Sequence, residues 1–379
     1  MSMPGPTSRD ITGEGSREAT AREAIEAIKG RGTAENPKNR FAARHTEPTD
    51  DGWGGGQAIV DRGAAPPTRL FPDRTVNLIA RNQSPDIPFD RSINPYKGCE
   101  HGCIYCFARP THAYLDLSPG LDFETKIFYK TRVRERLAEA LSKPSYQCQT
   151  IAMGTNTDPY QPAEKRHRIT REVLQVLLET RHPVSLVTKS RLILRDLDLL
   201  TQLAELGLVS VAVSVTTLSN SLKTKLEPRT AGPQARLRTI AALAEAGVPV
   251  SAMVAPVIPF INDQEIEHIV AAVSDAGAAS AGYILLRLPG EVRDLFHAWL
   301  RQHYPLKADR VINAVRGTRG GQDYQAKWGV RMRGEGQVAE LIAARFKQAL
   351  KQAGLVAKTD VRLRTDLFRP PGQQQLNLL

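Results

Sequence analysis

The sequence has few cysteines and no long apolar run. Only 4 of its 379 residues are cysteine, which excludes a small secreted fold built on disulfides. No stretch approaches the roughly 18 to 20 apolar residues of a membrane-spanning helix. The first residues, MSMPGPTSRD, lack the apolar centre of a signal peptide. We therefore expect a cytoplasmic protein without a membrane segment.

The charged residues are unbalanced toward the basic side. Lys and Arg number 51 against 40 Asp and Glu, which gives a formal net charge of +11. Such a balance favours contact with anions, among them nucleic acids, nucleotides and acidic lipid surfaces. The net charge alone does not identify the partner, because many basic proteins bind no nucleic acid.

Composition divides the chain into four parts. Residues 1–70 are rich in Gly, Pro, Ser, Thr and charge, and they hold too few large apolar side chains to offset the entropy of ordering. We expect a disordered extension there. Residues 71–290 form the expected core, residues 291–365 continue with helical patterns, and residues 366–379 read as a flexible polar tail.

Short runs of branched apolar residues alternate with amphipathic patterns in the core. Strands are expected at 92–94, 150–153, 183–188, 209–215, 250–257 and 281–286, and helices at 133–141, 169–180, 194–206, 234–246 and 264–276. Further helices are expected at 292–304, 308–316 and 337–353. This alternation predicts a parallel sheet, either a partial or complete (β/α) barrel or, as the alternative, a doubly wound open sheet. In both folds the chemistry is expected at the C-terminal ends of the strands.

Three of the four cysteines follow the first expected strand directly. The segment reads Asn94-Pro-Tyr-Lys-Gly-Cys99-Glu-His-Gly-Cys103-Ile-Tyr-Cys106, a C-x3-C-x2-C spacing. Closely spaced thiolates bind soft metals and iron–sulfur clusters, and Gly98 and Gly102 relax the backbone so that the sulfurs can converge. Three thiolates on a four-iron cluster leave one iron open to an external ligand.

Two other interpretations of the cysteines stay open. Their spacing of i, i+4 and i+7 also suits one buried stripe of a helix, although the nearby Gly98 and Gly102 disfavour a helix. A zinc site completed by His101 or Cys148 is the second alternative. Cys148 precedes the second expected strand, so we expect it at the opposite end of the sheet as a small buried residue.

The cysteine spacing, the aromatic residue before the third cysteine and the place of the loop resemble the radical S-adenosylmethionine (SAM) superfamily. The segments NPYKGCEHGCIYCFARPTHAYL, GTNTDPYQPAE, VTKS and LEPRTAGPQARL resemble, more narrowly, the bacterial group related to spore photoproduct lyase, often called DNA repair photolyase-like. The resemblance covers about residues 85–290. It implies a partial or complete parallel (β/α)6-type radical SAM barrel with a disordered N-terminal extension and a helical C-terminal segment.

The resemblance also implies cofactors. Cys99, Cys103 and Cys106 would hold a [4Fe-4S] cluster, and the amino and carboxylate groups of SAM would chelate the fourth iron. An electron from a reductant such as flavodoxin or ferredoxin would then cleave SAM to a 5′-deoxyadenosyl radical. Candidate SAM contacts at the strand ends are Tyr105, Thr155, Asn156, Thr157, Asp158, Lys189, Ser214, Arg229 and Arg236. Arg229 or Arg236 either binds the SAM carboxylate or orders the loop around Glu227.

We expect a radical SAM enzyme that acts on nucleic acid, in DNA repair or modification. The alternatives are a radical SAM enzyme with a protein or small-metabolite substrate, and a non-catalytic regulator that binds zinc or an iron–sulfur cluster. The C-terminal peptide Gln375-Leu-Asn-Leu-Leu379 resembles the short peptides with which bacterial replication and repair proteins bind the sliding clamp. The clamp is therefore an expected partner.

Overall fold

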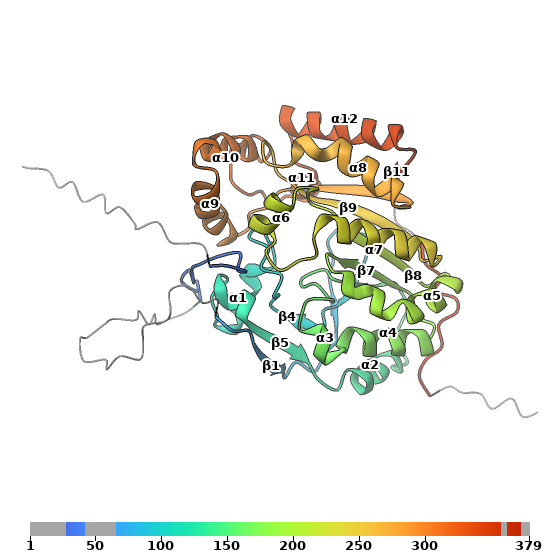
Figure 1. The fold of residues 1–379 in the computed structure, drawn as a ribbon. Coiled ribbons are helices and arrows are strands. Elements are labelled where there is room, and N and C mark those ends of the chain that lie inside the picture. The colour runs from blue at the N-terminus through green and yellow to red at the C-terminus, as the bar shows by residue number, and fades with distance from the viewer. Residues whose placement is uncertain (1–27, 42–65, 358–361, 373–379) are drawn as a thin grey trace, which may run out of the picture.

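The computed structural model describes residues 28–41, 66–357 and 362–372 (Figure 1). Six parallel strands form the centre of its main sheet. They are β3 (Arg91–Ile93), β6 (Ile151–Met153), β7 (Val184–Thr188), β8 (Val209–Ser214), β9 (Val250–Val257) and β10 (Ser280–Leu285). All six expected strands are thus confirmed, with boundaries that differ by at most a residue or two.

The order of the strands decides between the two predicted folds. The sheet runs β11-β10-β9-β8-β7-β6-β3-β2, so the parallel strands follow chain order without the reversal of a doubly wound sheet. β2 (Ile79–Arg81) pairs antiparallel with β3, and β11 (Val356–Ala357) extends the other edge beside β10. Because these edge strands do not pair with each other, the fold is a partial barrel.

Helices cover the outer face of this sheet. They are α2 (Val133–Leu141), α4 (Ile169–Glu179), α5 (Leu197–Glu205), α7 (Pro233–Glu245) and α8 (Ile266–Asp275). In α4 the residues Ile169, Val173 and Leu177 are buried at a spacing of four, which is the period of one helix face. The strands are buried on both faces, as in β6, because they lie between these helices and the barrel interior.

A second, smaller sheet was not predicted. It has the order β1-β5-β4 and consists of β1 (Arg69–Asp73), β5 (Lys126–Lys130) and the two-residue β4 (Tyr96–Lys97). Its strands carry Arg, Lys and Asp among their apolar residues, and each is at most five residues long, so sequence periodicity gives little signal. The 3-10 helix η1 (Arg109–Leu115) and α1 (Leu121–Thr125) lie beside this sheet.

Short helices connect the strand ends. They are η2 (Arg191–Asp196) after β7, α3 (Glu164–His167) after β6, α6 (Asn220–Leu226) after β8 and η3 (Asp263–Glu265) after β9. Ser219 caps α6 by accepting a hydrogen bond from the backbone N–H of Leu222, which satisfies a free N-terminal donor.

The C-terminal region is helical, as expected. It contains α9 (Val292–His303), η4 (Pro305–Lys307), α10 (Ala308–Gly317), α11 (Val330–Arg333) and α12 (Gln337–Gln352). Figure 1 shows α12 over α8 and places α9 next to α10. The buried faces of α9 and α10 share one apolar cluster with Cys103, Ile104 and Tyr105. The C-terminal helices therefore support the cysteine loop.

Part of the expected N-terminal extension lies against the core. Arg31 donates to the carbonyl of Glu124 at 3.0 Å, the N–H of Gly32 donates to Oε2 of Glu124 at 3.0 Å, and Asn39 donates to the carbonyl of Ala113 at 3.0 Å. Residues 28–41 of the expected extension therefore contact the core. Polar side chains anchor the segment, and a count of apolar residues does not detect such anchors.

The expected tail is also partly attached. The N–H of Arg369 donates to the carbonyl of Thr180 at 2.8 Å, and Phe368 packs on Tyr146 and His182. One half-buried aromatic residue and two backbone hydrogen bonds, from Arg364 and Arg369, hold residues 362–372 at the N-terminal ends of the strands. The predicted clamp-binding peptide, Gln375 to Leu379, lies outside the described residues.

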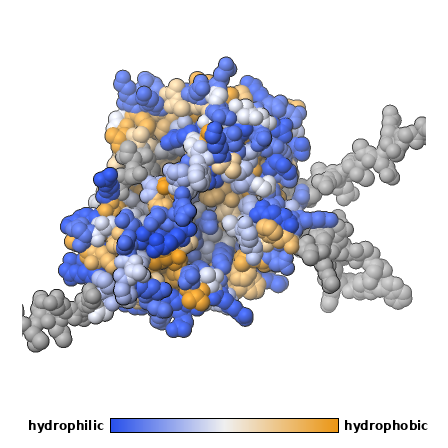
Figure 2. Space-filling model, turned by 180° about the vertical axis from the view of Figure 1, so that it is seen from behind, coloured by the Kyte–Doolittle hydropathy of each residue, from blue (hydrophilic) through white to orange (hydrophobic). Residues whose placement is uncertain are grey.

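The described surface is mixed in polarity. Figure 2 shows hydrophilic residues over most of one face, interrupted by small hydrophobic patches. Among the described residues, none of the helices has the length and apolar content to cross a bilayer.

Candidate functional site

The three clustered cysteines lie in one irregular loop between β4 and η1. Cys99 and Cys103 are buried, Cys106 is half-buried, and all three are free thiols. The N–H of Gly102 bonds to the carbonyl of Cys99 at 3.4 Å, and that of Cys106 to the carbonyl of Cys103 at 3.2 Å. These are isolated turns, so the cysteines do not form a stripe on a helix.

Gly102 gives the loop its shape. Its φ of +65° is the left-handed conformation that glycine adopts without steric cost. A Cβ at this position would lie 2.6 Å from Oε2 of Glu124. Gly98, with φ of +80°, begins the same loop. The two glycines therefore allow the backbone to turn between the sulfurs, as the sequence predicted.

Four hydrogen bonds to three neighbouring segments fix the loop. The N–H of Cys99 donates to the carbonyl of Phe123 at 2.9 Å, and that of Ile104 to the carbonyl of Leu226 at 3.1 Å. Gln161, which is fully buried, accepts from the N–H of Glu100 at 2.9 Å and donates to the carbonyl of Gly98 at 3.1 Å. The loop therefore spans the ends of β6 and β8.

Arg109 and Glu124 complete this support and were missed by the sequence analysis. Arg109 donates from Nε to the carbonyl of Cys103 at 2.9 Å and pairs with Glu124 at 2.5 Å. Both side chains are fully buried. The two residues are fifteen positions apart in unrelated elements, so no spacing rule connects them. The Arg-Pro pair at the start of η1 is the one local signal.

Burial raises the pKa of all three cysteine thiols. The carboxylate of Asp158 adds to this effect at Cys99, and that of Glu227 adds to it at Cys103. Lys189 acts in the opposite direction at Cys103. The free thiols are therefore protonated, and binding of a metal or cluster would release protons. As a donor set, three soft sulfurs fit an iron–sulfur cluster.

Behind the loop lies a buried charged network centred on Glu227. Its carboxylate accepts hydrogen bonds from the hydroxyl of Tyr105, the hydroxyl of Thr216 at 2.6 Å and the guanidinium of Arg236. Lys189 Nζ lies 3.8 Å from Oε1. Burial raises the pKa of Glu227, but Arg236 and Lys189 outweigh it and lower that pKa to about 2. Glu227 is therefore ionised.

Arg236 orders this network, and its side chain is buried with its hydrogen-bond donors already in use. It donates to the carbonyls of Ala231 and Ser214 at 2.9 and 3.0 Å, besides Glu227, and it is 2% exposed. The geometry favours the second expected role of Arg236, ordering the Glu227 loop, over binding a SAM carboxylate. Ser214 contributes its carbonyl to Arg236 and is buried as well.

Several predicted residues of the loop after β6 already form hydrogen bonds with other parts of the protein. Asp158 accepts from the hydroxyl of Thr188 at 2.7 Å and from the N–H of Lys189 at 2.8 Å. Thr157 donates to the carbonyl of Tyr96 at 2.9 Å. These two residues position the strand ends. Thr155 and Asn156 are bound to Asn94 and keep exposed surface.

Two predicted residues retain access to solvent near the cysteine loop. Lys189 has a side chain that is 17% exposed and lies 6.0 Å from the ring centroid of Tyr105. Arg229 is about one-third exposed and pairs with Glu100 at 3.2 Å. The structure thus brings Lys189, Tyr105, Ser214 and Arg236 together around Glu227. It places Arg229 against Glu100 and His101 of the cysteine loop.

The zinc alternatives find little geometric support. His101 Nδ1 lies 3.3 Å from Asp158 Oδ2, so one ring nitrogen already has a partner. Cys148 precedes β6 at the opposite end of the sheet, as predicted, but it is half-buried rather than buried. Within the described ranges, no three His, Cys, Asp or Glu side chains converge as ligands of a single metal ion.

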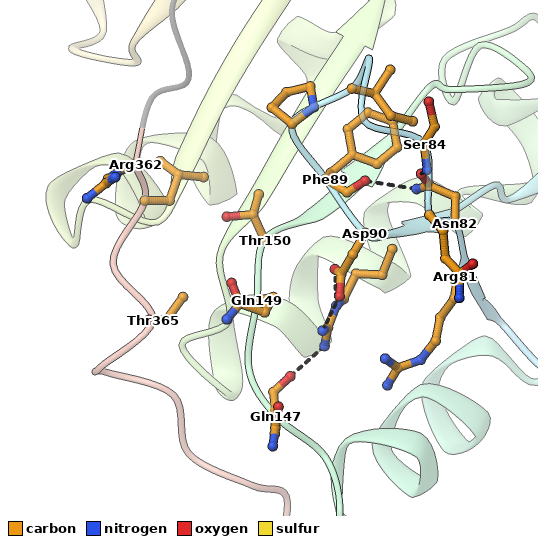
Figure 3. A pocket seen from close by; sticks show the side chains of 15 residues that line it. Arg81, Asn82, Ser84, Phe89, Asp90, Gln147, Gln149, Thr150, Arg362 and Thr365 are labelled. Atoms are coloured by element: carbon orange, nitrogen blue, oxygen red, sulfur yellow. Dashed lines mark hydrogen bonds and ion pairs between the residues drawn. The ribbon is translucent and has the colours of Figure 1, made fainter. Parts of the chain in front are cut away.

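A polar pocket of about 740 Å³ lies away from the cysteines (Figure 3). Arg91 and Thr150, at the starts of β3 and β6, line it together with Arg81, Gln147 and Arg362. Arg91 is already paired with Asp90 at 2.7 Å. The pocket is therefore at the N-terminal ends of the strands, opposite the end where chemistry is expected in this type of fold.

Comparisons with known proteins agree with the geometry. The sequence model of the radical SAM superfamily matches residues 93–273, from the end of β3 into α8. An uncharacterised protein of Mycobacterium tuberculosis is 41% identical over 232 residues, which cover 61% of this chain and 68% of the relative. An uncharacterised protein of Methanocaldococcus jannaschii is 27% identical over 221 residues, covering 58% and 79% respectively.

Solved structures share the fold. Spore photoproduct lyase in complex with dinucleoside spore photoproduct superposes with a TM-score of 0.55 at 14% identity, over 75% of this chain and 78% of that enzyme. A mutant of the same enzyme with bound AdoMet and the dinucleoside gives the same values. Radical SAM enzymes use a [4Fe-4S] cluster and SAM, and they need a reductant. The family match and the relative at 41% identity show that this chain belongs to the radical SAM superfamily and is an enzyme with these cofactors.

Proposed function

We propose that Cys99, Cys103 and Cys106 hold the [4Fe-4S] cluster and that SAM binds its fourth iron. The observation that carries this proposal is the position of three free, largely buried thiols on one loop at the C-terminal end of the sheet. Cys148 lies at the other end, and His101 is paired with Asp158. No fourth protein ligand is therefore at hand in the described chain.

The side chains around the loop suit distinct tasks. A bound cluster and SAM would supply the radical chemistry, in which a 5′-deoxyadenosyl radical would take a hydrogen atom from the substrate. We assign the SAM carboxylate to Lys189, whose Nζ is partly exposed, and the SAM amino group to the exposed polar atoms of Thr155 and Asn156. Tyr105, which lies between the second and third cysteines in the sequence, is held by Glu227 through its hydroxyl.

The parts of the chain divide this work. We assign both cofactors to the core, residues 71–290. The C-terminal helices of residues 291–365 pack on the apolar side of the cysteine loop, and residues 28–41 of the N-terminal extension pack on its polar side. Both contacts would shield a bound cluster from water.

The substrate that we propose is nucleic acid, in DNA repair or modification. The net charge of +11 favours a polyanion, and the fold matches an enzyme solved with a dinucleoside photoproduct. Flavodoxin or ferredoxin is the proposed reductant. Binding to the sliding clamp through Gln375 to Leu379 stays a prediction.

The test compares three proteins reconstituted with iron and sulfide without oxygen: wild type, Cys103→Ala and Cys148→Ala. We expect Cys103→Ala to lose the brown chromophore and deoxyadenosine formation together. Cys148→Ala, at the far end of the sheet, should keep both. A Cys103→Ala protein that retains cluster and SAM cleavage would contradict the ligand assignment. A colourless wild-type protein that binds only zinc would favour the alternative function, a non-catalytic zinc-binding regulator.

A further inference from the structure

Two arginines lie at the C-terminal end of β10 and have no acidic partner. Arg287 follows β10 by two residues and is half-buried, and Arg319 follows α10 and is 1% exposed. Arg319 donates to the carbonyls of Leu286 and Val330, each at 2.8 Å. Among the described residues, the one hydrogen bond of the Arg287 side chain is a weak one, to Sδ of Met332 at 3.5 Å.

This pair leaves positive charge uncompensated. Within the described chain neither guanidinium forms an ion pair with a carboxylate, and the Nε of each is buried without a hydrogen-bond partner. Two acids lie nearby. Asp86 is already bound to Arg331 at 2.5 Å, and Glu335 is exposed and forms no ion pair with either arginine. Burial and the neighbouring charge of Arg287 lower the pKa of Arg319 to about 10. Buried charges of one sign are costly, and an anion would offset that cost.

An exposed aromatic ring stands next to this charge. Phe107 directly follows Cys106 and is 43% exposed. The guanidinium carbon of Arg287 lies 5.0 Å from the centre of its ring. A ring with a cation on one face can stack a nucleobase on its other face, because every base has a π face.

A second stack of the same kind follows the neighbouring strand. Phe260 comes three residues after β9, and the guanidinium carbon of Arg310 lies 4.0 Å from its ring centre. Phe260 packs against the apolar cluster that contains Cys103 and Tyr105. Arginine-covered rings thus occur at the ends of both β9 and β10, which suits a strand of several nucleotides.

We propose that Phe107, Arg287 and Arg319 form a nucleotide subsite in which an unstacked base lies on Phe107 and its phosphate binds Arg287. Arg319, fixed by the carbonyls of Leu286 and Val330, adds buried positive charge to the subsite. The subsite rests on the proposed function, because it names the form of nucleic acid that this site takes. A base inside a duplex does not offer its face to Phe107, so the ligand is single-stranded or has a flipped-out base.

The test measures binding of a fluorescently labelled single-stranded DNA, and of the same sequence as a duplex, to the reconstituted full chain. Phe107→Ala and Arg287→Ala should each weaken single-strand binding about tenfold, whereas Phe107→Tyr keeps the ring and the affinity. Arg287→Ala should also lower the slope of log affinity against log salt by about one. Arg134→Ala, which removes an exposed charge on α2, is the matched control.

Three results would overturn the subsite. They are an Arg287→Ala affinity equal to that of Arg134→Ala, an equal loss for duplex and single strand, and a wild type that binds a short acidic peptide as tightly as DNA. Measuring deoxyadenosine formation in the absence of substrate distinguishes a failure of the nucleotide subsite from a failure of the proposed function. If wild type and Arg287→Ala both cleave SAM while DNA binding is unaffected, the subsite is wrong and the radical SAM assignment stands.

Discussion

The guanidinium of Arg109 lies 2.5 Å from the carboxylate of Glu124, and neither side chain is exposed to solvent. Arg109 comes three residues after the last cysteine of the loop, and Glu124 lies in α1. Glu124 also accepts the N–H of Gly32 at 3.0 Å. This single pair therefore joins the cysteine loop, α1 and the N-terminal segment.

Replacement of Arg109 should destabilise the protein strongly. Arg109→Ala leaves the carboxylate of Glu124 buried without its partner, which costs about 3–5 kcal/mol in comparable pairs. We expect this loss in the free energy of unfolding measured with urea, and a lower iron content after reconstitution. Arg134→Ala, from the exposed pair with Glu179, should cost less than about 1 kcal/mol. Equal losses for the two variants would show that the buried pair has no special role.

The regular part of the fold could be predicted from the sequence because each element carries its own signal. The expected helix at 133–141 coincides with α2, since its apolar residues repeat at helical spacing. β9 coincides with its predicted range, because a strand buried on both faces is a continuous apolar run. The cysteine loop was found for a similar reason: its ligands are neighbours in sequence.

The buried charged network of the site and the small sheet depend instead on contacts between residues far apart in the sequence. Glu227 binds Tyr105, which lies 122 positions earlier, and no local pattern marks that pair. Arg236 and Arg229 look alike in sequence, yet one is buried against Glu227 and the other is partly exposed beside Glu100. The small sheet of β1, β5 and β4 escaped prediction because its short strands are held by partners across the fold.

Gly32 should be sensitive to the smallest substitution. A Cβ at this position would lie 1.7 Å from the carbonyl oxygen of Gly102, so Gly32→Ala must push the N-terminal segment or the cysteine loop aside. We expect faster loss of the cluster absorbance on exposure to air. Gly317→Ala is the control, because its Cβ would meet nothing within 4 Å. If both variants lose the cluster at the wild-type rate, residues 28–41 do not protect it.

His182 should make the stability depend on pH. It is fully buried, and its ring nitrogens contact the hydroxyl of Tyr146 at 2.7 Å and the carbonyl of Pro183 at 3.0 Å. Burial lowers the pKa of His182 to about 4 from an ordinary 6.5. The unfolded chain therefore binds a proton more readily between these values, and the free energy of unfolding should fall as the pH drops from 6.5 to 4.

His182→Gln tests that dependence. It loses contacts and so lowers the free energy of unfolding at every pH, but it removes the titrating group. The curve of unfolding free energy against pH should then be flatter than that of wild type over this interval. His112, whose pKa is also lowered by burial to about 4, contributes in the same direction and stays in both proteins. Parallel curves for wild type and His182→Gln would contradict the prediction.

Glu227 should make the stability depend on pH in a more acidic range than His182 does. Its pKa in the folded protein is about 2 against an ordinary 4.5, because Arg236 and Lys189 outweigh the effect of burial. Its ionised form therefore stabilises the fold above about pH 4.5, and that contribution is lost as the pH falls toward 2. Glu227→Gln leaves Arg236 without its carboxylate and should cost about 3–5 kcal/mol at neutral pH.

The difference in unfolding free energy between wild type and Glu227→Gln should accordingly shrink on acidification, which denaturation curves at several pH values would measure. Glu179→Gln is the control, because its carboxylate is exposed and its effect should stay small throughout. A difference that remains constant down to pH 3 or below would mean that Glu227 has the same pKa in the folded and the unfolded chain. In that case Arg236 and Lys189 would not favour the ionised carboxylate, and the charge balance next to Cys103 would rest on hydrogen bonds alone.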